Sequence, residues 1–344
     1  MRFGPVPVAE SVGLIAAHSV RAGDAVVRKG RAIAAEDAAR LAAAGIAEVV
    51  AVRLEPDDVG EDAAAARLAA AVAGPGVAVE PPFTGRANLH AAQAGLLVLD
   101  EAAIGAVNRV DEAVTLATLV PYKPVVAGEM VATVKIIPYA VPGAVLERAL
   151  AAAAPAIRVA PYRLTRVAAI STLLPGLKAS VVDKTLRTLE ARLAPAGARL
   201  VGEVRVPHEA GAVAHALRHA IERDRAELAV VFGASAIADR RDVIPAGIEA
   251  AGGVVDHLGM PVDPGNLLLL GRLGQDSRHP VPVIGAPGCA RSPKENGFDW
   301  VLQRLLSGLP VTRGDIVGFG VGGLLMEIVS RPQPRDGGAS ADDA

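Results

Sequence analysis

The sequence has a single cysteine, Cys289, and few aromatic residues. One cysteine excludes an internal disulfide and any zinc site built from several cysteine ligands. Such cysteine usage is typical of a reducing compartment, so we expect a cytoplasmic protein. Aromatic residues make up only 3% of the chain, while aliphatic residues dominate its apolar half. This composition predicts a core of helices packed on buried, Val/Ile/Leu-rich strands.

Long hydrophobic runs and an excess of basic charge are also missing. No apolar run approaches the roughly 20 residues that a membrane-spanning helix needs, and residues 1–5 do not begin a secretory signal. The formal net charge is -2, and no basic stripe alternates with aromatic residues. This argues against a nucleic-acid partner and against a membrane protein. A small molecule is therefore the expected ligand.

Two regions with different patterns follow one another along the chain. Residues 1–157 mix short helical and extended patterns and predict a mixed α+β region. Further on, extended and helical segments alternate, at 164–170, 181–193, 199–206, 210–223 and 228–232. This alternation predicts an α/β domain over 158–310, doubly wound, with a mainly parallel sheet between two helical layers. We expect a short β segment at 311–330 and a disordered tail at 331–344.

Three loops of this domain carry residues that suit a bound anion. Residues 233–242 follow an apolar run and begin with the small residues Gly233, Ala234 and Ser235. Residues 259–266 end in a Pro-Gly turn, and residues 285–289 follow the apolar run 281–284. Ligands of open α/β sheets bind outside the carboxyl ends of the strands, so we expect these loops to form one crevice.

The three loops carry a family resemblance. In order and spacing, GASAIADRRDVIPAGIEAAGG, PVDPGN and VIGAPG resemble the signature segments of the molybdopterin-binding domain of molybdenum cofactor biosynthesis proteins. The resemblance covers residues 163–307. Residues 1–150 more loosely resemble the N-terminal part of proteins in which this domain precedes a molybdenum cofactor nucleotidyltransferase.

The resemblance implies a ligand, partners and site residues. The ligand is molybdopterin, joined by Mg²⁺ and molybdate if the chain inserts molybdenum. The implied partners are a nucleotidyltransferase and a second copy of the chain, in a homo-oligomer. Asp242 is the candidate catalytic residue. The candidate cofactor-binding residues are Ser171, Thr172, Gly233, Ala234, Ser235, Asp239, Arg240, Arg241, Pro264, Gly265, Asn266, Pro287, Gly288 and Cys289.

The chain departs from the family pattern at the positions of the carboxylates and lysines on which molybdate chemistry depends. Residues 172–175 read Thr-Leu-Leu-Pro where the family carries an acidic pair, and Asp263 and Asn266 replace two lysines. These differences favour a protein that binds or presents the pterin phosphate, while a transferase with altered catalytic motifs stays open. Two other classes also stay open: a nucleotide pyrophosphatase of the competence-damage-inducible type, and a non-catalytic scaffold for cofactor-processing enzymes.

Several of these features also have structural interpretations. Residues 239–242 are either ligand-binding or a solvated charge run that caps the helix beginning near Pro245. Cys289 has no histidine beside it and fits a small buried residue better than a nucleophile. His215 and His219 are spaced like metal ligands but lack a third ligand, so we predict no metal site. Lys178 and Lys184 are candidates to bring positive charge to the crevice.

Overall fold

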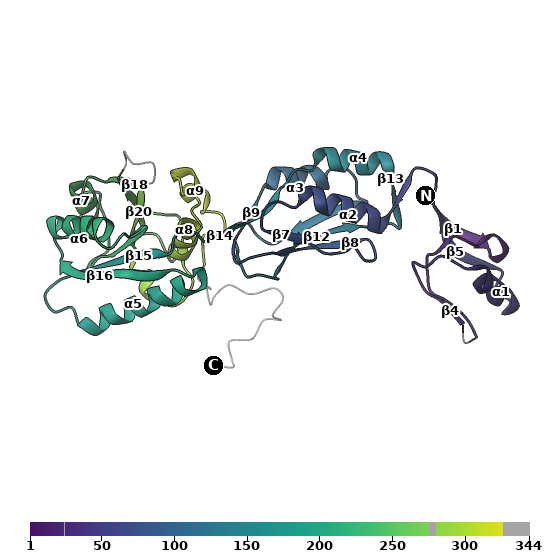
Figure 1. Ribbon diagram of the computed structural model, residues 1–344, viewed down its shortest axis with the longest axis horizontal. Coiled ribbons are helices and arrows are strands. Elements are labelled where there is room, and N and C mark those ends of the chain that lie inside the picture. Colours follow the sequence, from purple (N-terminus) through teal and green to yellow (C-terminus); the bar gives the residue numbers. More distant parts are fainter. Residues whose placement is uncertain (24, 275–279, 326–344) are drawn as a thin grey trace, which may run out of the picture. The chain divides into compact units, whose positions relative to one another are not determined.

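The computed structural model describes residues 1–23, 25–274 and 280–325. The chain forms two compact units, Met1–Pro161 and Tyr162–Ala344 (Figure 1). The strand β14 (Ile157–Pro161) pairs with β9 (Gly95–Leu99), and residues 157–161 therefore belong to the first unit. The described helices are all too short or too polar to cross a lipid bilayer.

The first unit begins with a small sheet of strand order β1-β5-β2. Its strands are β1 (Arg2–Pro7), β5 (Glu48–Arg53) and β2 (Ile15–Ala16). The other elements are the short 3-10 helix η1 (Val8–Glu10), the hairpin of β3 (Val20–Ala22) and β4 (Ala25–Val27), and the helix α1 (Ala35–Ala43). Val49 and Ala51 of β5 and Leu41 of α1 share one buried core.

The remainder of the first unit has its own core. A four-stranded antiparallel sheet has the order β10-β12-β8-β7, with β10 at Val114–Thr118, β12 at Met130–Ile136, β8 at Arg86–Ala91 and β7 at Val77–Val79. Smaller pairings join β9 to β11 (Pro124–Val125), and β6 (Asp58–Gly60) to β13 (Ala140–Pro142). The helices are α2 (Glu61–Val72), α3 (Glu101–Asn108) and α4 (Gly143–Ala152). The mixture of helices and strands predicted for this part of the chain is confirmed.

The second unit is built on a six-stranded sheet with the order β16-β15-β17-β20-β19-β18. The strands are β15 (Arg166–Leu173), β16 (Arg199–Pro207), β17 (Leu228–Phe232), β18 (Val254–Leu258), β19 (Leu269–Leu273) and β20 (Val281–Ala286). The neighbours from β16 to β20 are parallel, whereas β19 runs antiparallel to both β20 and β18. The sheet is therefore mixed, and the expected parallel arrangement holds for four adjacent strands.

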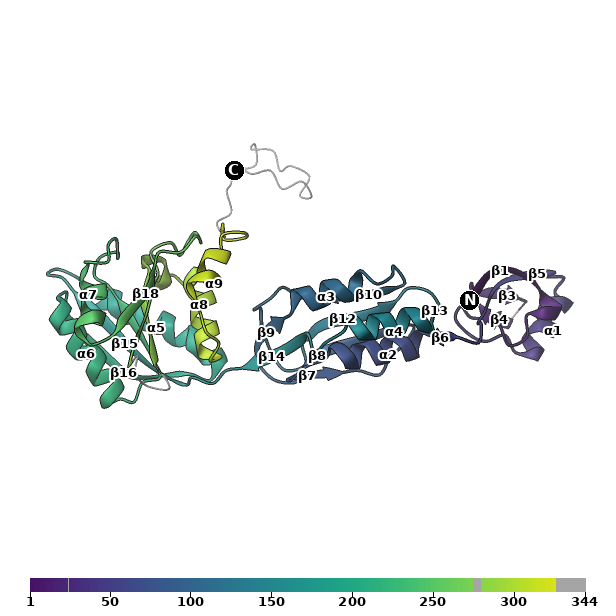
Figure 2. The same ribbon diagram turned by 90° about the horizontal axis from the view of Figure 1, so that it is seen from above.

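Helices cover both faces of this sheet. One buried core joins the sheet to α5 (Ala179–Leu193), α8 (Gly297–Leu306) and α9 (Arg313–Gly318). A second core joins the opposite face to α6 (Ala210–Glu222) and α7 (Val243–Ala250). Figure 2 shows α6 and α7 on one side of the strands and α8 and α9 on the other. Two short 3-10 helices, η2 (Ala194–Ala196) and η3 (Gly288–Arg291), complete the unit.

Two predictions for the second unit have different outcomes. The alternation of strands and helices up to residue 232 is confirmed by β15, α5, β16, α6 and β17. The β segment predicted at 311–330 is wrong for residues 313–318, which form α9, and residues 326–330 lie outside the described residues. Thr312 and Asp315 cap this helix by exchanging hydrogen bonds between side chain and backbone. The tail predicted at 331–344 lies outside the described residues.

Candidate functional site

The carboxyl ends of β15, β17 and β20 lie at one edge of the sheet. In the parallel register Ser171 is paired with Phe232, and Phe232 with Ala286, so the three strands end side by side. The loop after each strand therefore begins at the same edge. His208, which directly follows β16, joins them there because its backbone N–H donates to the carbonyl of Leu173.

The turn Gly233-Ala234-Ser235 is held from one side by hydroxyl and imidazole groups. The amide of Ala234 donates to Thr172 Oγ1 over 2.7 Å. Thr172 Oγ1 also lies 2.8 Å from His208 Nδ1, and the other ring nitrogen of His208 lies 3.1 Å from Ser235 Oγ. Thr172 is buried and Ser235 is exposed, so the network runs from the core to the surface.

Arg291 holds the same turn from the other side. Its guanidinium donates to the Gly233 carbonyl over 2.7 Å and to Thr185 Oγ1 over 3.1 Å. It also lies 5.7 Å above the ring of Phe232. Gly233 fits this clamp because a Cβ there would come within 2.5 Å of the Ser235 carbonyl oxygen. Burial lowers the pKa of Arg291, since the half-buried charge has lost part of its hydration.

The first loop offers an anion free backbone amides and not the N-terminus of a helix. The helix α7 begins only at Val243, so Gly233 to Ser235 do not lie at its N-terminus. Within the described part of the chain, the exposed amides of Ser235 and Ala236 have no protein acceptor. Two free, exposed amides at this turn are available to hydrogen-bond an anion.

The charged run at residues 239–242 has mainly structural contacts. Arg241 pairs with Asp239 over 2.7 Å and lowers the pKa of that carboxyl through its hydrogen bonds. Arg240 donates to the carbonyl of Val255 over 3.2 Å. Asp242 is the N-cap of α7 and accepts a hydrogen bond from the amide of Val243. The helix-capping interpretation of this run is thus confirmed for Asp242.

The second loop packs against the start of α8. The carbonyl of Pro264 accepts a hydrogen bond from the amide of Gly297 over 3.0 Å, and Gly265 is buried beside it. A Cβ on Gly265 would come within 3.0 Å of that same amide nitrogen. The side chain of Asn266 is exposed, while its carbonyl accepts from the amide of Met260. Pro264 and Gly265 therefore shape the loop.

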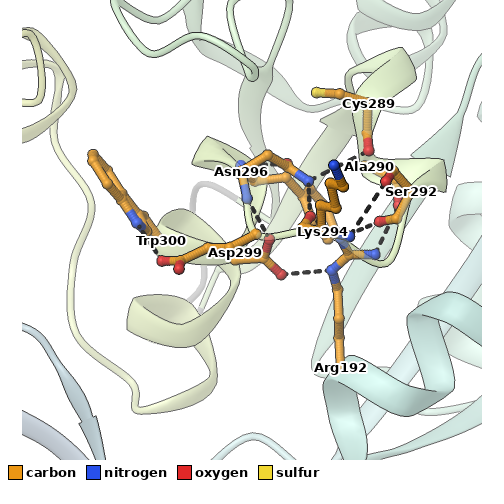
Figure 3. A network of polar contacts seen from close by, with 10 residues as sticks. Arg192, Cys289, Ala290, Ser292, Lys294, Asn296, Asp299 and Trp300 are labelled. Atoms are coloured by element: carbon orange, nitrogen blue, oxygen red, sulfur yellow. Dashed lines mark hydrogen bonds and ion pairs between the residues drawn. The ribbon is translucent and has the colours of Figure 1, made fainter. Parts of the chain in front are cut away.

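The third loop is braced by Arg192 of α5 (Figure 3). The Arg192 guanidinium pairs with Asp299 over 2.5 Å and donates to the carbonyls of Ala290 over 2.8 Å and Ser292 over 2.6 Å. Asp299 also accepts from the amide of Asn296, which caps α8. These contacts tie α5, η3 and α8 together behind the loop.

Within this loop, Pro287 is buried, Gly288 is exposed, and Cys289 is half-buried. A Cβ on Gly288 would meet nothing within 4 Å, so this residue faces open space. The segment that follows is a 3-10 helix of only four residues, too short to provide the N-terminus of an α-helix. Burial raises the pKa of the Cys289 thiol, which favours the protonated form.

A groove with unpaired positive charge lies beside the Arg291 clamp. A cavity of about 480 Å³ is lined by Ser180, Val181, Lys184, Thr185, Arg187 and Arg291. Lys184 and Arg187 also line an adjoining cavity of about 320 Å³. Across residues 1–23, 25–274 and 280–325, no carboxylate lies within ion-pair distance of Lys184, Arg187 or Arg291. We call these three residues and their cavities the cationic groove.

The structure brings together some of the predicted residues and adds others. Thr172, Gly233, Ala234 and Ser235 form one network, and Ser171 lies next to Thr172 with its buried hydroxyl unpaired. Asp239, Arg240 and Arg241 bond to other groups. Sequence reasoning missed His208 and Arg291. The available signal for His208 was its place two residues after the strand predicted at 199–206.

The described side chains contain no cluster of three histidine, cysteine or acidic residues that could hold a metal ion. His219, one of the two histidines spaced like metal ligands on α6, lies 3.4 Å from Asp224 instead.

Comparison with known proteins gives one family match and several distant structural similarities. Residues 5–53 match a domain of unknown function, DUF8806. No curated protein gives a significant match to the chain.

The similar solved structures include a molybdopterin biosynthesis MoeA protein from Pyrococcus horikoshii, with 16% identity, a TM-score of 0.31, and coverage of 89% of this chain and 75% of that one. The MoaB enzyme of molybdopterin biosynthesis from Thermus thermophilus has 19% identity, a TM-score of 0.30, and coverage of 43% and 99%. A molybdenum cofactor biosynthesis protein from Pyrococcus furiosus has 11% identity, a TM-score of 0.26, and coverage of 92% and 65%. Sequence identities and TM-scores this low do not support a conclusion about function.

Proposed function

We propose that this protein binds molybdopterin at the edge formed by the ends of β15, β17 and β20, and presents it to a processing enzyme. The observation that carries the proposal is the cationic groove. Within the described residues Lys184, Arg187 and Arg291 have no carboxylate partner, and Arg291 bonds to the Gly233 carbonyl of the Gly233-Ala234-Ser235 turn. The phosphate of molybdopterin is the group that such a groove suits.

Arg291 connects the groove to the turn. Its guanidinium already bonds to the Gly233 carbonyl, and a guanidinium can bind two phosphate oxygens at once. The exposed amides of Ser235 and Ala236 add neutral donors next to Gly233 in the sequence. A ligand with an anionic end and a polar ring would contact both parts. The order of the three loops along the sequence supports the pterin as that ring.

A binding or presenting role agrees with the residues after β15. The Thr172 hydroxyl is engaged by Ala234 and His208, and residues 173–175 are Leu, Leu and Pro. This segment contributes no carboxylate at the place where molybdate insertion would call for one. The proposal therefore assigns the chemistry to a partner enzyme, with a nucleotidyltransferase as the candidate.

Calorimetric titration of the full chain with molybdopterin under anaerobic conditions tests this proposal. Arg187→Gln removes one charge of the groove, and we expect weaker binding than in the unmodified protein. Arg223→Gln is the matched control, because it removes the same charge at the end of α6, which packs on the opposite face of the sheet. We expect the control to bind normally.

The alternatives give different results in the same preparation. Metal-dependent turnover of dinucleotides or nucleotide sugars, without affinity for molybdopterin, would favour the pyrophosphatase. A stable complex with a cofactor-processing enzyme, again without ligand affinity, would favour the scaffold. Equal affinities of the two arginine variants would remove the groove from the proposal.

A further inference from the structure

We infer that His208 is a positioning residue that fixes the Ser235 hydroxyl as a hydrogen-bond donor for an anionic group of the ligand. The inference rests on the proposed function for the identity of that ligand. It is carried by a separate observation, the chain of contacts from Ala234 through Thr172 and His208 to Ser235. The Ser235 side chain lies at the exposed end of this series of hydrogen bonds.

The donor and the acceptor of each hydrogen bond in this series follow from the number of protons available. The Thr172 hydroxyl accepts a hydrogen bond from the amide of Ala234, and it has one proton to donate. Of the described groups, only His208 Nδ1, at 2.8 Å, is placed to accept that proton. Thr172 is 1% exposed, so water does not replace this acceptor. An unpaired hydroxyl proton here would cost the desolvation of a buried donor.

The count therefore leaves Nδ1 of His208 unprotonated and places the ring proton on Nε2. Nε2 then donates to Ser235 Oγ over 3.1 Å. The Ser235 hydroxyl accepts from His208, and its own proton has no other acceptor within the described chain. This proton is consequently left for a ligand.

The same count decides what kind of chemistry Ser235 supports. A serine nucleophile needs a neighbouring imidazole nitrogen with a free lone pair to take its proton. Here the lone pair of His208 faces Thr172, and the nitrogen that faces Ser235 carries a proton. Ser235 is thus a binding group. Together with the amides of Ser235 and Ala236 it gives the turn three donors for one anion.

Imidazole ¹⁵N spectra of the ligand-free protein test the proton count without any ligand. The signals of His208 are assigned by their absence in His208→Gln, because the chain has seven histidines. We expect a protonated Nε2 and an unprotonated Nδ1. Thr172→Val removes the donor to Nδ1 and should shift His208 towards a mixture of tautomers. A proton on Nδ1 of the unmodified protein would overturn the inference.

A double-mutant cycle with molybdopterin tests the positioning role. Ser235→Ala should weaken binding roughly tenfold to a hundredfold, the range for a hydrogen bond to a charged group. His208→Phe should weaken it as well, but the double variant should bind no more weakly than Ser235→Ala, because His208 acts through Ser235. His208→Gln, which can still accept and donate, should keep most of the affinity. Additive losses would mean that His208 only supports the fold.

Inorganic phosphate separates failure of this inference from failure of the proposed function. If the unmodified protein does not bind molybdopterin, the proposed function is wrong. The amide signals of Ser235 and Ala236 then decide the inference. Phosphate-induced shifts that Ser235→Ala reduces would sustain it for another phosphate ligand. The absence of any shift in the unmodified protein would end it.

Discussion

Arg192 of α5 braces the short helix η3, and Arg291 is the last residue of that helix, yet the two guanidinium groups bond to different partners. Arg192 is 10% exposed and bonds to the carboxylate of Asp299, itself 11% exposed, and to backbone carbonyls. Arg291 is half-buried, and among the described residues its hydrogen bonds go to neutral acceptors, the Gly233 carbonyl and Thr185 Oγ1. One guanidinium is neutralised within the protein, and the other keeps its charge.

This difference separates a structural charge from a charge available to a ligand. A buried ion pair holds its two partners in place, and removing one partner leaves the other unpaired in a poorly hydrated site. A guanidinium with neutral partners keeps its attraction for an added anion. We therefore assign Arg192 to the folding of the third loop and Arg291 to binding. Each prediction that follows tests one side of this contrast.

Arg192→Met should have the largest effect, and that effect should be on stability. It would leave Asp299 buried and unpaired, together with the carbonyls of Ala290 and Ser292. We expect a loss of roughly 3–5 kcal/mol in the free energy of unfolding. Urea unfolding followed by Trp300 fluorescence measures it, because Trp300 is the only tryptophan and lies in α8.

Neutralising the Asp299 carboxylate, which Arg192→Met leaves without its partner, provides the control. Asp299→Asn in the Arg192→Met background removes the buried charge but leaves an oxygen to accept from Asn296. Part of the lost stability should return. If the double variant is no more stable than Arg192→Met, the cost does not come from the unpaired charge.

Arg291→Gln should act mainly on binding. We expect the affinity for molybdopterin to fall roughly tenfold or more, because a charge-assisted hydrogen bond to phosphate is lost. The free energy of unfolding should fall by only about 1 kcal/mol, since glutamine can still donate to the Gly233 carbonyl. Titration and urea unfolding of the same variant give both values. A stability loss as large as that of Arg192→Met would show that the two arginines have the same role.

The more exposed members of the cationic groove should give a smaller effect, visible in the salt dependence. Lys184 and Arg187 lie at the surface, where dissolved ions screen their attraction for an anion. We expect raised ionic strength to weaken binding roughly fivefold, on the scale of one solvated charge pair. Titrations of Arg187→Gln at low and high salt should show a flatter dependence. An unchanged slope would exclude Arg187 from the binding surface.

Much of the second unit was predictable because its signals are local. Apolar runs and helical periodicity located the elements from β15 to β17 within a few residues. The direction of β19 has no such signal, since an apolar run reads the same in a parallel or an antiparallel strand. The helix α9 did have a signal, the capping pattern of Thr312 and Asp315, but the prediction of a β segment at 311–330 did not use it.

The site was less predictable because its contacts join distant segments. His208 is 36 positions from Thr172, and Arg291 is 58 positions from Gly233. These pairs meet only because β16 and β20 are placed on either side of β15 and β17 in the strand order. The charged run of residues 239–242 drew attention as a pattern, yet Asp242 caps α7. Local patterns located the loops, and the strand order determined which side chains meet.

The smallest effect we predict concerns Cys289, which lies in η3 together with Arg291. Burial raises the pKa of its thiol, while the charge of Arg192 acts in the opposite direction. A raised pKa means less thiolate near neutral pH, so alkylation should be slower in the folded protein than in urea, and should accelerate only at higher pH. Alkylation can be followed by mass, because Cys289 is the only cysteine.

Arg192→Met should slow the folded-state reaction further, whereas Arg291→Gln should leave it unchanged. A folded rate equal to the rate in urea would contradict the burial, and equal responses to the two substitutions would contradict the contrast between the arginines.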